Sequence, residues 1–233
     1  MTIKKLLLAA LLATAASAAA SDKPAKVAVT PESKDAAVIV HAPVMSVPYV
    51  IGFSKFDPVQ SSLQSNSFGG WANIDVRGDR STDGYLVRRI KPGTYVLRDV
   101  SQQSAWGVCF HERTVQFDVK PGQVLYLGQF DGVTAVTELQ RNAVTHGDMT
   151  ARGSDVHLYF DGITPPTFTP VDPAELDRVK AFMASAMPKT SVAPQAVAFR
   201  PATFGTGRDL FGMQRICGGY YKKKVDAAPT AGS

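Results

Sequence analysis

Apolar and polar residues alternate along several short segments of the chain. The clearest segment runs from Thr114 to Val119, where the apolar residues Val115, Phe117 and Val119 fall on one face. Such alternation predicts a strand with one buried and one hydrated face. Other segments rich in β-branched and aromatic residues predict strands at 37–41, 46–53, 71–77, 85–90, 94–98, 106–110, 124–127, 134–139 and 155–160. Because short strands at regular spacing are typical of sandwiches and barrels, we expect a mainly β fold, an antiparallel β-sandwich over residues 37–163.

Tight turns separate these predicted strands. The tripeptide Lys-Pro-Gly occurs at residues 91–93 and again at residues 120–122. Proline fixes the φ angle of the second turn residue, and glycine supplies the positive φ that a type II turn needs at the third. Asp83 and Gly84 form a further two-residue turn signal. We therefore expect the strands on either side of each turn to pair as hairpins.

The pattern changes to helical spacing after a stretch with three prolines at residues 163–170. Asp172 is suited to the N-cap, Pro173 to the first helical position and Glu175 to the third. An apolar stripe follows at residues 176, 179, 182, 183, 186 and 187, and Pro188 ends the pattern. We expect a C-terminal amphipathic helix packed on the sandwich, within an extension over residues 164–224.

The two ends of the chain have a different composition. Residues 1–20 combine a basic start, an apolar centre and an Ala-x-Ala site that ends at Ala18 or Ala20, as in a cleavable signal peptide. We expect a flexible leader at residues 21–36, a disordered tail at residues 225–233, and a periplasmic or secreted location. No later run approaches the roughly 18 apolar residues of a membrane helix, so we expect no transmembrane helix in the mature chain.

Charge and cysteine content narrow the picture further. The formal charge of the 233-residue chain is +5, and removing Lys4 and Lys5 lowers it to +3. This weakly basic composition lacks the basic stripe of a nucleic-acid binder. The two cysteines, Cys109 and Cys217, are expected to form a disulfide in an exported protein, with two separate buried thiols as the alternative.

The two proline–glycine turns also carry a resemblance. Residues 90–97 (IKPGTYVL) and residues 119–127 (VKPGQVLYL) resemble uncharacterised bacterial envelope domains of the transthyretin-like or carboxypeptidase-regulatory kind. The resemblance covers roughly Val38 to Phe160. It implies a small antiparallel sandwich without an agreed activity, so no catalytic residue is carried over. Many members of that family look like lipoproteins, whereas no cysteine lies near the expected cleavage site of this chain.

Candidate metal sites are poorly supported by the sequence. His111 and Glu112 begin like a zinc-protease motif, but Val115 stands where the second histidine belongs. Residues 79–84 place oxygen-bearing side chains as a calcium loop does, yet Ile90 replaces the glutamate at its twelfth position. We therefore expect no metal and no cofactor.

Two functions of different kinds are compatible with this sequence. The first is a non-catalytic envelope module, binding or structural, whose partner is an envelope protein, a peptide or a glycan. Its binding surface would include Trp71, Tyr85 and Tyr159 as exposed aromatic residues. The alternative is a periplasmic hydrolase with a polar site where the sheet meets a helix, formed by His111, Glu112 and Asp131.

Overall fold

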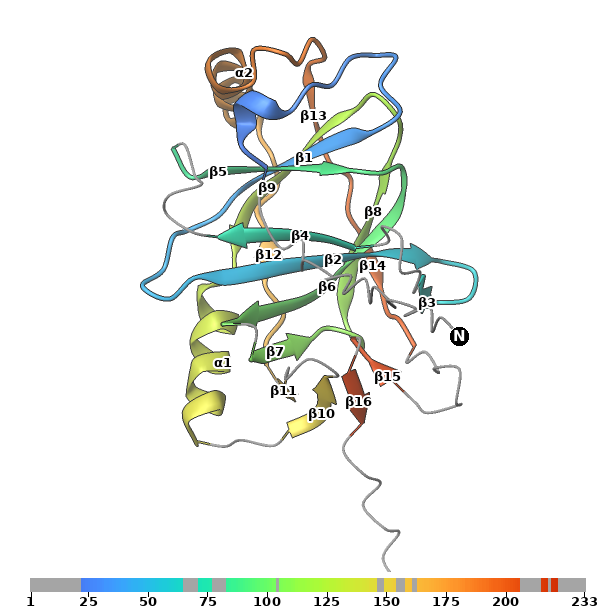
Figure 1. Ribbon diagram of the computed structural model, residues 1–233, viewed down its shortest axis with the longest axis vertical. Helices are drawn as coiled ribbons and strands as arrows, with labels where there is room; N and C mark the ends of the chain where they lie inside the picture. The colour runs from blue at the N-terminus through green and yellow to red at the C-terminus, as the bar shows by residue number, and fades with distance from the viewer. Residues whose placement is uncertain are drawn as a thin grey trace, which may run out of the picture.

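The computed structural model shows a mainly β protein in which two sheets are stacked on each other (Figure 1). It describes residues 22–64, 71–76, 83–103, 105–145, 149–153, 158–160, 163–205, 215–217 and 219–221. Within these residues the smaller sheet has five strands: β1 (Ala36–His41), β5 (Tyr85–Ile90), β9 (Val124–Asp131), β12 (Thr167–Phe168) and β13 (Pro194–Ala196). The mainly β fold expected from the sequence is confirmed.

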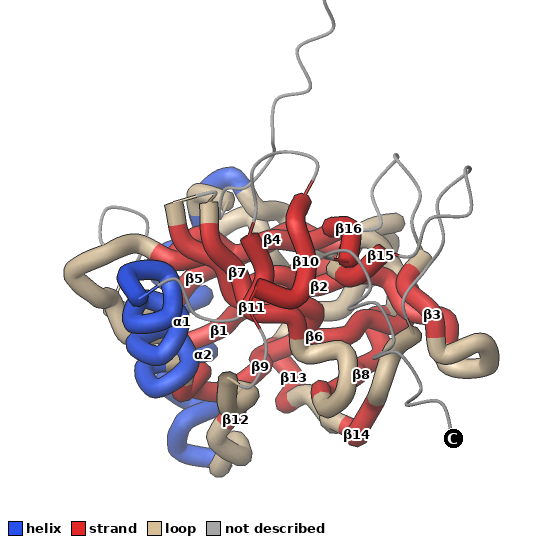
Figure 2. The backbone as a smooth tube through the Cα atoms, turned by 90° about the horizontal axis from the view of Figure 1, so that it is seen from below, coloured by secondary structure: helices blue, strands red, loops and turns tan. Residues whose placement is uncertain are grey.

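The larger sheet has eleven strands within the described residues. They are β2 (Tyr49–Asp57), β3 (Ser62–Leu63), β4 (Trp71–Val76), β6 (Gly93–Gln102), β7 (Trp106–Cys109), β8 (Thr114–Val119), β10 (Met149–Gly153), β11 (Leu158–Phe160), β14 (Arg200–Ala202), β15 (Arg215–Ile216) and β16 (Gly219–Tyr221). The helical elements are η1 (Pro24–Lys26), α1 (Val133–Thr145) and α2 (Pro173–Ala186). Seen from below, they gather toward one side of the strands (Figure 2).

Strand β1 shows how the layers are built, because both of its faces are buried. Val38 and Val40 point into the main core between the two sheets. Ala37 and Ile39 point outward into a second core, which α2 covers with Val179, Phe182 and Met183. A strand buried on both faces needs a continuous apolar sequence, and residues 36–40 supply one.

The strand pairing is mixed. Most neighbours are antiparallel, but β9 runs parallel to β1 and to β13, and β11 runs parallel to β7. Parallel neighbours require the chain to leave a sheet and return to it. Between β1 and β9, for example, the chain leaves the smaller sheet after β5 and returns to it at β9, and both changes occur at Lys-Pro-Gly turns.

Both Lys-Pro-Gly turns are corners between sheets, and the hairpin expectation is wrong. The first leads from β5 in the smaller sheet to β6 in the larger one, and the second leads from β8 back to β9. Gly93 and Gly122 have φ angles of +148° and +67°, so the positive φ expected for the glycines is present. The two corners are neighbours, because Gly93 pairs with Val119 across β6 and β8.

The Asp83–Gly84 turn behaves in the same way. Both residues have positive φ angles, +53° and +81°, as a two-residue turn requires. Yet β4 lies in the larger sheet and β5 in the smaller one, so the strands on either side are not hydrogen-bonded to each other. Local turn chemistry was therefore predicted correctly, and the partner of each strand was not.

Residues 134–139 were expected to form a strand and instead belong to α1. Ala135, Val136 and Leu139 are the buried residues of this helix, and they join the main core. Their spacing of one, three and four residues is that of one helix face. Thr134, the first residue of the expected strand, is exposed at the start of the helix.

The expected C-terminal helix is confirmed as α2. The Asp172 carboxylate accepts a hydrogen bond from the Glu175 backbone N–H at 2.7 Å, and Pro173 begins the helix. The expectation of a flexible leader is wrong for the described residues 22–35. Val27 and Val29 are buried in the core under α2, and Ser191 donates its backbone N–H to the Val29 carbonyl. Their alternate spacing directs both side chains to the same side.

The segment after residue 164 completes the sandwich. Strands β12 and β13 extend the smaller sheet, and β14 to β16 extend the larger one. The C-terminal extension therefore contributes strands to both sheets. Residues 1–20 and 225–233, assigned above to a signal peptide and a tail, lie outside the described residues, as do the candidate calcium ligands at residues 79–82.

Candidate functional site

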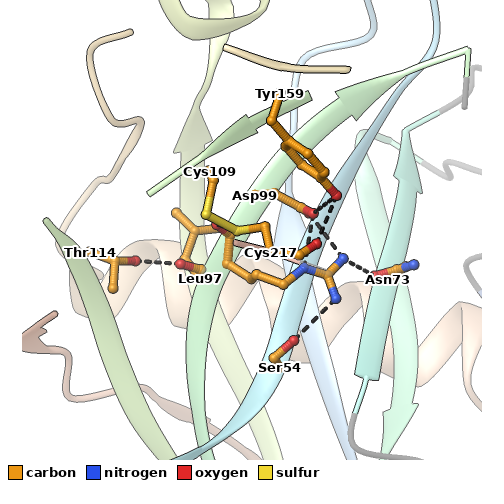
Figure 3. A network of polar contacts seen from close by, with 9 residues as sticks. Ser54, Asn73, Leu97, Asp99, Cys109, Thr114, Tyr159 and Cys217 are labelled. Atoms are coloured by element: carbon orange, nitrogen blue, oxygen red, sulfur yellow. Dashed lines mark hydrogen bonds and ion pairs between the residues drawn. A yellow bond between two sulfur atoms is a disulfide. The ribbon is translucent and has the colours of Figure 1, made fainter. Parts of the chain in front are cut away.

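The most elaborate polar arrangement in the described chain is a buried ion pair on β6 (Figure 3). Arg98 and Asp99 are adjacent in sequence and 5% and 2% exposed. Neighbouring strand residues normally point to opposite faces. Here the register shifts, because Gly52 of β2 pairs with Asp99 while Phe53 pairs with Leu97. The extra residue, Arg98, forms a β-bulge that brings both charged side chains onto the outer face.

The Arg98 guanidinium is held by several acceptors. Its Nε donates to Asp99 Oδ2 at 2.8 Å and its Nη2 to Asp99 Oδ1 at 3.1 Å. Its Nη1 donates to Ser54 Oγ at 3.1 Å, and Nη2 also reaches Asn73 Oδ1 at 3.5 Å. A two-point arginine–carboxylate contact fixes both side chains and satisfies their charges away from water.

Gly52 makes room for this pair. A Cβ atom at residue 52 would lie 1.8 Å from Asp99 Oδ1 and 2.8 Å from Arg98 Nη2. No side chain can be accommodated at these distances without moving the ion pair. A glycine within a strand often marks a bulge or a close approach, and here it marks both.

The bulge lies at a division in the larger sheet, where β6 changes its pairing partner from β8 to β7. Strand β8 pairs with the first part of β6, residues 93–96, and β7 pairs with the last part, residues 99–102. The carbonyls at the division find other partners: Leu97 O accepts the Thr114 hydroxyl, and Arg98 O accepts the Phe110 backbone N–H at 3.0 Å. The division therefore leaves neither carbonyl unpaired, as buried backbone requires.

The C-terminal segment covers the pair. A disulfide joins Cys109 of β7 to Cys217, in the turn between β15 and β16, and their Cα atoms are 5.9 Å apart. The disulfide predicted from the sequence is confirmed. Tyr159 donates its hydroxyl to the Cys217 carbonyl at 2.9 Å and lies 3.5 Å from Asp99 Oδ2. With Val96 and Phe204, these residues form a small apolar core over the outer face.

This arrangement is suited to holding structure. The charges of Arg98 and Asp99 are paired with each other, and the disulfide and Tyr159 stand between them and solvent. Surface hollows occur elsewhere: one of about 390 Å³ is lined by Asp22, Asp35 and residues 88–91. Another of about 380 Å³ lies between the β2–β3 turn and β14, and its lining includes Glu112 and Gln116. Neither hollow is lined by Arg98 or Asp99.

The aromatic residues proposed as a binding surface are not assembled into one. Tyr85 is buried under α2, where its ring centroid lies 4.8 Å from that of Phe182. Tyr159 is buried on the other sheet, over the ion pair. The expectation that these two tyrosines are exposed is therefore wrong, because each fills a core on the outer face of its own sheet. The side chain of Trp71 lies outside the described part of the molecule.

The hydrolase candidates are placed on separate elements. His111 and Glu112 lie in the loop before β8 of the larger sheet, and Asp131 ends β9 of the smaller sheet. His111 is half-buried near Phe204, whereas Glu112 and Asp131 are exposed. No hydrogen bond or ion pair described in the structure joins the three side chains. General acid–base catalysis needs such contacts, at least through one water molecule, so this arrangement gives the hydrolase hypothesis no support.

Among the described residues, no three His, Cys, Asp or Glu side chains are gathered as a metal site requires. In the same part of the chain, neither helix has the length and apolar character needed to span a bilayer.

Comparison with known proteins adds no relative. No protein-family model, curated protein or solved structure matches the chain.

The bulged ion pair is the feature that sequence reasoning missed. An Arg-Asp dipeptide inside an apolar strand is a weak signal, since either residue could face solvent. Gly52, in the middle of the apolar segment 49–53, is the second signal. Only the pairing of β2 with β6 shows that Gly52 lies directly against the ion pair.

Proposed function

We propose that this protein is an exported, non-catalytic module of the cell envelope, active in the periplasm or after secretion, which binds or supports another envelope component. The disulfide is the observation that carries this proposal. Buried disulfides that close long loops are typical of oxidising compartments and rare in the cytosol. The signal-like residues 1–20 point to the same compartment.

The buried polar network supports the non-catalytic part of the proposal. Arg98 and Asp99 are buried charged side chains, and their bonding capacity is used within the fold. A catalytic constellation instead offers a nucleophile, a base or an oxyanion donor to a cavity. The envelope-domain family that the Lys-Pro-Gly turns resemble is consistent with such a role.

Export is tested by expressing the full chain with a C-terminal tag, fractionating the cells and measuring the mass of the product. We expect a tagged product in the envelope or medium that begins after Ala18 or Ala20 and carries no free thiol. Replacing both alanines by leucine removes the small residues of the cleavage site, so the uncleaved chain should accumulate. A full-length, reduced product confined to the cytosol would contradict the proposal.

A further inference from the structure

The smaller sheet ends on one side in the short strand β13, which lies with β12 and β14 along the lower margin of Figure 2. On its inner side β13 runs parallel to β9, and the Val197 backbone N–H donates to the Tyr126 carbonyl at 3.0 Å. Among the described residues, no strand pairs with its other side. Residues 194–198 therefore form a free edge of the sandwich, called here the β13 edge.

The alternation of a strand decides which backbone groups this edge offers. Because Val197 donates toward β9, its neighbours Ala196 and Ala198 direct their N–H and C=O groups outward. Pro194 belongs to the same outward set and offers only a carbonyl. Ala196 and Ala198 are exposed, and no hydrogen bond of the described chain occupies their outward groups. Such a row of unpaired groups is a template for another strand.

The β13 edge has little of the protection that keeps free edges apart. Natural sheets usually guard an edge with charged side chains, prolines or bulges. Residues 192–199 read VAPQAVAF and contain no charged residue, and Pro194 removes one donor only at the start of the edge. The first charge beyond them, Arg200, is paired with Asp118 at 2.8 Å. Two copies of this edge can thus meet without bringing like charges together.

The donors and acceptors of the edge match a second copy of the same edge. In an antiparallel pair with a two-fold axis at Ala196, this residue and its copy exchange both N–H···O bonds. The Ala198 N–H then donates to the carbonyl of Pro194 of the partner subunit, and symmetry repeats this bond on the other side of the axis. Each outward N–H finds an acceptor, because Pro194 has no N–H to leave unpaired.

We infer that the protein forms a two-fold symmetric dimer in which the β13 edges of two copies pair as antiparallel strands centred on Ala196. The pairing joins their two five-stranded sheets into one continuous sheet across the axis. The contact is shorter than the interfaces of permanent dimers, so the dimer dissociates on dilution. This inference goes beyond the proposed envelope function and depends only on the fold.

Sedimentation velocity of the full-length chain, purified as the cell processes it, measures the monomer–dimer equilibrium. We expect the dimer fraction of the parent to rise as its concentration approaches about 1 mM. In Ala196→Lys two ammonium groups would meet at the axis, so dimerisation should weaken more than about ten-fold. The control Val144→Lys adds the same charge at a 77% exposed position of α1, at the opposite end of the molecule in Figure 1. It should change dimerisation less than about two-fold, because that charge is distant and screened.

A cysteine at the axis provides an independent measurement. The Cα atoms of a hydrogen-bonded antiparallel pair lie about 5.5 Å apart, a separation that a disulfide bridges. Ala196→Cys should therefore form a covalent dimer in the presence of oxidised glutathione, by thiol–disulfide exchange between the two chains. Val144→Cys should remain a monomer under the same conditions. Non-reducing electrophoresis measures both products.

Two results would overturn the inference. One is a parent protein that stays monomeric up to about 1 mM, which would leave the edge to a strand from a different protein. The other is equal behaviour of the residue-196 and residue-144 variants while their urea midpoints remain that of the parent. If Ala196→Lys lowers the midpoint, the cysteine variants decide alone. Export is read from the cleaved product and its disulfide, so failure of the dimer and failure of the proposed function are distinguishable.

Discussion

Removing one member of the buried ion pair should destabilise the protein far more than removing both. In the Arg98→Met variant, Asp99 stays 2% exposed and loses its two contacts at 2.8 and 3.1 Å. An uncompensated buried charge costs about 3–5 kcal/mol, and Asp99→Leu should cost a similar amount for the same reason. In the double variant no charge is left unpaired, so its free energy of unfolding should lie within about 2 kcal/mol of the parent value.

Urea denaturation followed by circular dichroism, with the disulfide intact, measures these four free energies. Two single-variant costs of about 3 kcal/mol or more and a double-variant cost within about 2 kcal/mol give an expected interaction energy of about 4 kcal/mol or more, above the usual range for residues in contact. The exposed pair between Lys180 and Asp177 serves as a matched control, because its side chains are 51% and 72% exposed. Lys180→Met should cost less than about 0.5 kcal/mol. Additive effects at Arg98 and Asp99, or a cost below about 1 kcal/mol for Arg98→Met, would refute the reasoning.

Three further predictions concern other parts of the fold. Gly52→Ala should cost about 3 kcal/mol or more, because its Cβ would lie 1.8 Å from Asp99 Oδ1; urea midpoints measure this, and an unchanged midpoint would show that the bulge adapts freely. Replacing Cys109 and Cys217 by alanine removes a link between residues 108 positions apart and should cost roughly 4–5 kcal/mol, measured the same way; a much smaller cost would show that the unfolded cysteine-free chain keeps residual structure. Burial and a hydrogen bond to Glu175 raise the pKa of the Tyr126 hydroxyl. The contribution of this shift to the free energy of unfolding is therefore complete below about pH 10 and decreases above that value, by about 1.4 kcal/mol per pH unit. Tyr126→Phe should flatten the alkaline decline in stability, and an equally steep decline would exclude this tyrosine as its cause.

The individual strands were largely predictable, and their partners were not. Alternation and β-branched residues located β5 and β8 at the bounds that the structure shows, residues 85–90 and 114–119. The Lys-Pro-Gly signal reports only that the backbone bends. Whether the next strand pairs with the previous one or crosses to the other sheet depends on which apolar faces must be covered. That information is distributed over the whole chain.

The remaining differences have similar causes. Thr134 favours a strand by local propensity, but the three buried residues of α1 lie on one helix face, and packing against the core decides the outcome. Tyr85 and Tyr159 seemed available to solvent because the elements that cover them, α2 and the segment around Cys217, are distant in sequence. Cysteine content, by contrast, was sufficient to predict the disulfide, since only one pairing of two cysteines exists.

If the chain is exported as proposed, crossing a membrane from its N-terminus, the cover over Arg98 would also set an order of events. Strands β6 and β7 emerge more than a hundred residues before Cys217 does. Until the segment around Cys217 arrives, Cys109 would have no intramolecular thiol to pair with. On that route the disulfide could close, and the cover over the ion pair could form, only after residue 217 had crossed.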